Sequence, residues 1–137
     1  MTVGERAAQV WPLLVLCAVR RQLLSYDELS RLIGIPRPGL GQVLEPIQSY
    51  CILTRLPALS SLVVSHDSGM PGTGFIAATD VPREQAAVFR RAWFTVPVPT
   101  PQNFQDAVQQ LPSNGRSLSE LLHIAAVADG SGPKEHA

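Results

Sequence analysis

SYDELSRLIG (residues 25–34) opens the part of the chain that decides the predicted fold, and IPRPGLGQVLEPIQSYC (residues 35–51) and LPALSSLVVSHDSGMPGTGF (residues 56–75) complete it. The first segment has the pattern of a short amphipathic helix, and the second that of a longer helix behind a proline–glycine turn. The third has an apolar run of strand type, a turn and a return. In this order the segments predict a mainly α protein with a small β-hairpin, a winged helix-turn-helix.

The helix within residues 25–34 carries its own start and stop signals. Ser25 and Glu28 have the spacing of a capping box, in which the hydroxyl and the carboxylate each accept from an otherwise unpaired amide. Gly34 is placed to end the helix in the left-handed conformation. Three apolar residues predict the face that is turned toward the core: Leu29, Leu32 and Ile33.

The next helix is predicted to begin near Pro38, because the missing donor of proline costs nothing in the first turn. Pro46 should bend this helix or end it early. Four apolar residues at helical spacing predict its inward face: Leu40, Val43, Leu44 and Ile47. Five residues are predicted to turn outward: Arg37, Gly41, Gln42, Glu45 and Gln48.

The predicted wing is a β-hairpin. The run LSSLVVS (residues 59–65) is rich in strand-forming residues and would be its first strand. His66–Gly69 has the residues of a turn, since aspartate supplies a local hydrogen bond and glycine a positive φ. Residues 75–77 would then pair back with the first strand.

Helices are also predicted on both sides of this region. Residues 5–22 are apolar almost all round, which is typical of a buried central helix. Pro12 should kink that helix or mark a late start. Asp80 is placed to cap a helix that extends to about Trp93.

The C-terminal third is predicted to be a helical appendage. The segment VPVPTP (96–101) is extended and stiff, as expected of a linker. Two helices follow, one to about residue 111 and one after the Ser117–Glu120 capping box, the latter ended by Gly130. The expected domains are a winged helix-turn-helix at residues 1–95, a C-terminal helical extension at residues 96–130 and a disordered tail at residues 131–137.

The composition limits the kinds of partner. Eleven basic and eleven acidic side chains leave no formal net charge, which disfavours strong non-specific binding of polyanions. A nucleic-acid role must therefore rest on a local patch. Cys17 and Cys51 form no C-x-x-C pair and are expected to be reduced thiols of a cytoplasmic protein. The apolar run Trp11–Val19 is shorter than the roughly 20 residues that span a bilayer.

The candidate DNA-binding residues lie on the two central helices and the wing. The second helix would enter the major groove, which is wide enough for a helix. There Gln42 and Gln48 would contact adenine edges, and Arg37 a guanine edge or a phosphate. Phosphate contacts fix the register of a protein on DNA. Four further candidates are Tyr26, Arg31 and Arg55 on phosphates and His66 at the tip of the wing.

Catalytic and metal sites have weaker support. Cys51, His66 and Asp67 could form a nucleophilic site, but a thiol at the end of an apolar helix face is typically buried and inert. His66, His123 and His136 lie in three different predicted elements without the spacing of zinc ligands. No glycine-rich phosphate loop opens a helix. A non-enzymatic protein without metal or cofactor is therefore expected.

Three motifs resemble the C-terminal domain of the O6-alkylguanine-DNA alkyltransferases and the alkyltransferase-like proteins. SYDELSRLIG resembles the family's Thr-Tyr-Gly-Glu-Leu-Ala helix start, PGLGQVL its recognition helix, and LVVSHDSG the segment after its reactive site. The resemblance covers residues 24–75 and implies a winged scaffold in which the tyrosine matched by Tyr26 touches a phosphate near a flipped base.

The chain departs from that family where the chemistry lies. LSSL (residues 59–62) stands where the family has its reactive Pro-Cys-His-Arg, and Pro38 falls at the place of its base-displacing arginine, with Arg37 one residue earlier. Transfer of an alkyl group to the protein is therefore not expected. The scaffold alone does not determine a function.

Two functions are therefore predicted. The first is a non-enzymatic winged-helix DNA-binding protein, such as a transcriptional regulator, that dimerises through the apolar face of LLHIAAVA (residues 121–128). Two-fold DNA sites require such pairing. The second is a protein–protein interaction module, such as an adaptor, immunity or defence-associated protein, in which the same scaffold holds a protein partner.

Overall fold

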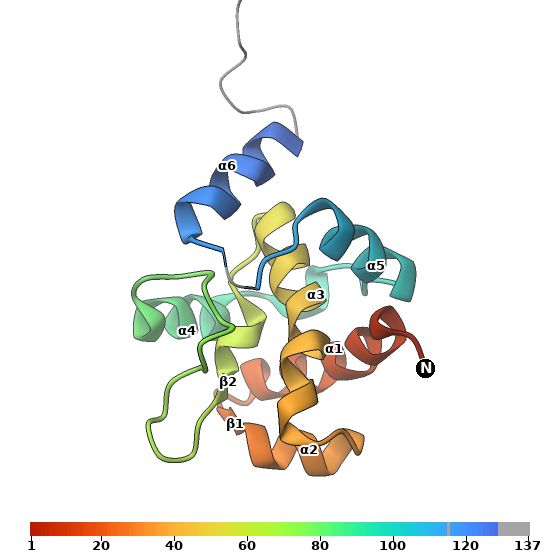
Figure 1. The fold of residues 1–137 in the computed structure, drawn as a ribbon. Coiled ribbons are helices and arrows are strands. Elements are labelled where there is room, and N and C mark those ends of the chain that lie inside the picture. Colours follow the sequence, from red (N-terminus) through yellow and green to blue (C-terminus); the bar gives the residue numbers. More distant parts are fainter. Residues whose placement is uncertain (115, 129–137) are drawn as a thin grey trace, which may run out of the picture.

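A computed structural model describes residues 1–114 and 116–128, and it is mainly helical, as predicted. Within these residues the chain forms six α-helices and one two-stranded sheet, and the sheet lies beside α2 (Figure 1). The helices are α1 (Val3–Val19), α2 (Tyr26–Ile33), α3 (Leu40–Leu53), α4 (Val81–Arg90), α5 (Pro101–Gln110) and α6 (Leu118–Ala128). The strands are β1 (Leu24–Ser25) and β2 (Val63–Val64), and the short 3-10 helices are η1 (Arg37–Gly39), η2 (Leu59–Leu62) and η3 (Trp93–Thr95). The predicted disordered tail, residues 131–137, and the predicted helix stop at Gly130 lie outside the described residues.

Helix α1 begins earlier than predicted, because Thr2 and Glu5 form a capping box ahead of it. Pro12 lies inside the continuous helix and is exposed. The prediction that α1 is buried all round is wrong, since Leu16 is 50% exposed and Val19 48%. One face of α1 therefore packs into the core, and the other carries apolar side chains to the surface.

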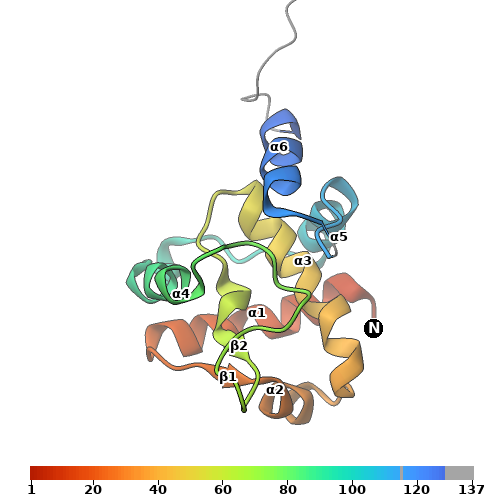
Figure 2. The ribbon, with the colours of Figure 1, turned by 60° about the vertical axis from the view of Figure 1, so that its left-hand side comes forward.

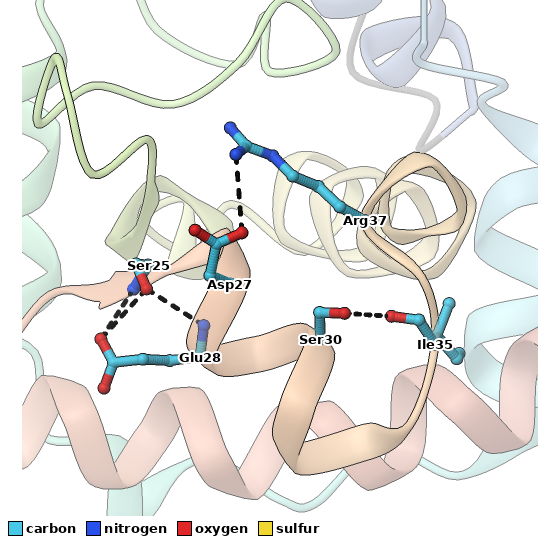
Figure 3. Close-up of polar contacts among 6 residues, drawn as sticks. All are labelled: Ser25, Asp27, Glu28, Ser30, Ile35 and Arg37. Carbon is cyan, nitrogen blue, oxygen red and sulfur yellow. Dashed lines mark hydrogen bonds and ion pairs between the residues drawn. The ribbon is translucent and has the colours of Figure 1, made fainter.

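The start and stop signals of α2 are confirmed. The Ser25 hydroxyl accepts from the Glu28 amide at 3.1 Å, and Glu28 reaches back to Ser25 (Figure 3). Gly34 ends the helix with φ 71°. The predicted inward position of Leu32 is wrong, because Leu32 is 61% exposed. Leu29 and Ile33, four residues apart, form the buried face of this helix of only eight residues.

Helix α3 follows α2 after a tight connection. The Ser30 hydroxyl donates to the Ile35 carbonyl at 2.6 Å, which holds that connection (Figure 3). Pro46 neither ends nor interrupts α3. As proline it offers no amide to the carbonyl of Gln42, one helical turn earlier. The four predicted inward residues are buried: Leu40, Val43, Leu44 and Ile47.

The predicted wing hairpin is wrong. Residues 59–62 form η2, and β2 pairs in parallel with β1, with Leu24 opposite Val63 and Ser25 opposite Val64. The predicted turn is present, since Gly69 has φ 67° and its amide donates to the Ser65 carbonyl. Residues 75–77 form no strand, and the Ile76 amide donates instead to the side chain of Gln48 in α3.

Helix α5 contributes directly to the main core. Phe104 is fully buried, and its ring lies 5.7 Å from Trp11 of α1 and 5.6 Å from Tyr50 of α3, measured between centroids. Trp93 joins this cluster at 5.8 Å from Trp11. The indole nitrogen of Trp93 donates to the Val88 carbonyl at 2.8 Å, which turns the chain after Arg90 and ends α4 before the predicted limit.

Helix α6 projects from the body at the end opposite α2 (Figure 1). Leu121 and Ala125 lie on its buried side, whereas the side chain of Leu122 is 56% exposed and that of Val127 is 61% exposed. The hydroxyl half of the predicted capping box is present, since the Ser117 hydroxyl accepts from the Glu120 amide, whereas the Glu120 carboxylate pairs with Arg116. None of the helices in residues 1–114 and 116–128 combines the length and the apolar character needed to cross a membrane.

Candidate functional site

A pocket of about 230 Å³ lies between α2, the start of α3 and the loop that follows β2. That loop, residues 65–80, passes along α3 before it reaches α4 (Figure 2). Apolar walls come from Leu40, Leu44 and Phe75. The polar residues that line it are Tyr26, Arg37, Glu45, Gln48, Ser60, Thr73 and Asn114. We call it the α2–α3 pocket.

Tyr26 joins α2 to the loop at the edge of this pocket. Its hydroxyl oxygen accepts from the Gly72 amide at 2.7 Å. A Cβ at Gly72 would lie 3.1 Å from that oxygen, so the close approach of the loop favours glycine. With its oxygen accepting from the loop, the Tyr26 hydroxyl retains a proton to donate.

Arg37 lies beside Tyr26, at the start of η1. Its guanidinium carbon is 5.5 Å from the centroid of the Tyr26 ring, within the range of a cation–π contact. It also lies 3.6 Å from a carboxylate oxygen of Asp27 (Figure 3). Both side chains of this ion pair are about half exposed, and such pairs contribute little to stability. Arg37 is therefore held near the pocket but can exchange Asp27 for another anion.

Gln48 is buried, and its predicted outward orientation is wrong. It is 2% exposed, and its amide nitrogen donates to the Ser113 hydroxyl at 2.9 Å. Its amide oxygen accepts from the Ile76 amide at 3.0 Å. Ser113 also lies 2.9 Å from the Ser49 hydroxyl. Gln48 thus ties α3 to two distant segments, and its side-chain amide is engaged within the protein.

Glu45 and Asn114 form another polar edge of the pocket. The Glu45 carboxylate accepts from the Asn114 backbone amide at 2.8 Å. The Asn114 side chain donates to the Gly41 carbonyl at 3.3 Å. The side-chain oxygen of Asn114 and the second carboxylate oxygen of Glu45 are acceptors. This edge can therefore bind a ligand that presents N–H groups.

The seven predicted DNA-binding residues divide into two sets. Tyr26, Arg37 and Gln48 line the α2–α3 pocket. The other four are exposed and outside its lining: Arg31 in the last turn of α2, Gln42 in the first turn of α3, Arg55 just after α3 with φ 58°, and His66 in the loop after β2.

Sequence reasoning did not assign a role to Ser60, Glu45 or Asn114. Ser60 is 5% exposed and lines the pocket. Two adjacent serines inside an otherwise apolar run were a signal for Ser60. Glu45 was expected only to face outward, and the position of Asn114 depends on how residues 111–114 pack against α3. Nothing local in the sequence indicated that packing.

Cys51 is fully buried, whereas His66 and Asp67 are exposed turn residues. Burial raises the pKa of the Cys51 thiol from its ordinary value of 9.0 to about 12, and burial also raises the pKa of Cys17. A thiol in this state is a poor nucleophile. No group of three or more potential metal ligands gathers within the described part of the chain.

The raised pKa of Cys51 makes stability depend on pH. Below pH 9.0 the thiol is protonated in both the folded and unfolded states, so its contribution is fully present. As pH rises from 9.0 toward about 12, the unfolded thiol ionises first and the free energy of unfolding falls. In this pH range, the free energy of unfolding measured with urea should fall less steeply for Cys51→Ala than for the native chain. Equal slopes would contradict the burial of a protonated thiol.

Comparison of the chain with protein-family models, with curated proteins and with solved structures gave no match.

Proposed function

We propose that this chain is a non-enzymatic, cytoplasmic DNA-binding protein that docks a duplex against α2 and the start of α3. The observation that carries this proposal is the α2–α3 pocket, with Tyr26 and Arg37 beside it. An arginine and the exposed start of a helix both favour a phosphate, because they present N–H donors and positive charge. The phosphate would replace Asp27 as the partner of Arg37.

The pocket would receive a base that has been extruded from the duplex. Proteins that bind such bases hold them between apolar or aromatic side chains and contact their polar edges. Leu40, Leu44 and Phe75 supply apolar walls here. The resemblance of Tyr26 to a tyrosine that touches a phosphate near a flipped base supports the same placement.

Binding is expected to depend on few phosphates. If Arg31 and Arg37 each contact one phosphate, the slope of log affinity against log salt should be about −2. Arg37→Ala should weaken binding about tenfold and reduce the slope by about 1, since it removes one charged contact. Fluorescence anisotropy with labelled duplexes over a salt series measures both quantities.

Arg90→Ala is the matched control, because Arg90 is also exposed but lies at the end of α4. This variant should keep the native affinity and slope. If no duplex binds even at low salt, DNA binding is excluded. If both variants weaken binding equally, the docking face is not at α2 and α3.

A second candidate is the protein–protein interaction module. An apolar groove of about 300 Å³ lies between α1 and the segment after α4, lined by Trp11, Val15, Leu16, Trp93, Phe94, Val96 and Val98 among others. Phe94 is 81% exposed and Val98 75%. Exposed apolar surface of this kind is typical of interaction sites. A partner protein would bind this groove and leave Arg37 without a role.

Under either function we propose that two copies pair through α6. Leu122 and Val127 place apolar side chains on the exposed side of this projecting helix. Sedimentation equilibrium of the native chain should give a dimer, and Leu122→Glu a monomer, because a charge would be buried between the copies. A native monomer at high protein concentration would exclude the pairing.

A further inference from the structure

Ser60 lines the α2–α3 pocket, and its buried hydroxyl lacks a hydrogen-bond partner among the described residues. The residue is 5% exposed. A buried hydroxyl left in this state costs about 1–3 kcal/mol, and buried polar groups are normally paired. A ligand that enters the pocket can supply the missing partner.

The neighbouring polar groups define which ligand could do so. The Gln48 side-chain amide is already bonded to Ser113 and Ile76. Glu45 has one carboxylate oxygen bonded to the Asn114 amide, and a carboxylate can accept several hydrogen bonds. Carboxylates on DNA-binding faces repel phosphates, but they accept well from the exocyclic amino group of cytosine.

We propose that the pocket selects an extruded base with an exocyclic amino group, with Glu45 accepting from that group. The Ser60 hydroxyl donates to the acceptor atom beside it on the same base edge. Cytosine presents this pair of groups, whereas thymine presents a carbonyl in place of the amino group and would face the Glu45 carboxylate with another acceptor. The inference rests on the proposed DNA-binding function, and it assigns Ser60 and Glu45 as the residues that determine specificity.

The experiment compares short duplexes that differ only in one unpaired, bulged base, cytosine or thymine, with a fully paired duplex as reference. Anisotropy titration of the native chain should show about tenfold tighter binding of the cytosine bulge than of the thymine bulge, the effect of one good hydrogen bond. Ser60→Ala and Glu45→Gln should each reduce this ratio to about twofold.

Ser61→Ala is the matched control. Ser61 is adjacent to Ser60, fully buried and likewise without a hydroxyl partner among the described residues, but it is outside the pocket lining. It should retain the preference for cytosine. Because neither hydroxyl is bonded, both variants are expected to fold, and their thermal melts by circular dichroism establish this.

The outcomes separate the two proposals. Absence of binding to all three duplexes at low salt overturns the proposed function itself. Binding with the expected salt slope but equal affinity for the cytosine and thymine bulges overturns the pocket assignment alone. A cytosine preference that survives Ser60→Ala, or is lost equally in Ser61→Ala, overturns the role of Ser60.

Discussion

Phe104→Ala is expected to lower the free energy of unfolding by about 4 kcal/mol, the usual loss when a buried aromatic ring is truncated to alanine. Phe104 is fully buried and contacts the rings of Trp11 and Tyr50. Its removal would leave a cavity where α5 meets α1 and α3. Urea unfolding followed by far-ultraviolet circular dichroism measures the change.

Phe94→Ala provides the control, because that ring is 81% exposed. Truncation of an exposed side chain typically changes stability by less than about 0.5 kcal/mol. A similar small loss for Phe104→Ala would mean that α5 folds on the surface of the protein without supporting its core.

Gln48→Met is expected to lower the free energy of unfolding by about 2 kcal/mol. Methionine has a similar length but offers neither the donor nor the acceptor of the amide. The Ile76 amide would lose its acceptor, whereas the Ser113 hydroxyl would keep the Ser49 hydroxyl as a partner. A buried polar group without a partner costs about 1–3 kcal/mol. The loss should appear in the same urea experiment.

Gln42→Met is the comparison, since Gln42 is on the same helix but exposed. Its stability should stay close to that of the native chain. If the two methionine variants unfold at the same urea concentration, the hydrogen bonds around Gln48 do not contribute to stability.

The predictions that the structure confirms rest on residues that lie close together in the sequence. The Ser25–Glu28 capping box and the left-handed Gly34 are both present as predicted. The inward face of α3 was correct because four apolar residues recur at helical spacing. In each case the information needed to form the structure lies within one or two helical turns.

The predictions were wrong where the structure depends on contacts between segments that are far apart in the sequence. Residues 63–64 pair with β1, which precedes α2 and α3, instead of with the nearby residues 75–77. Gln48 is polar and follows Ile47, but it is buried because residues 76 and 113 supply its partners. Local periodicity cannot identify such partners, and the same two segments supply Phe75 and Asn114 to the lining of the α2–α3 pocket.

The aromatic cluster also determines which changes the intrinsic tryptophan fluorescence of the protein can report. Both tryptophans, Trp11 and Trp93, are 3% exposed and lie edge to face at 5.8 Å. Their fluorescence should be blue-shifted and should move to the red when the core opens. The α2–α3 pocket contains Tyr26 and Phe75 but no tryptophan. Intrinsic emission therefore reports on the core and not on the α2–α3 pocket, and a tryptophan placed at residue 75 would add a separate reporter of occupancy of that pocket.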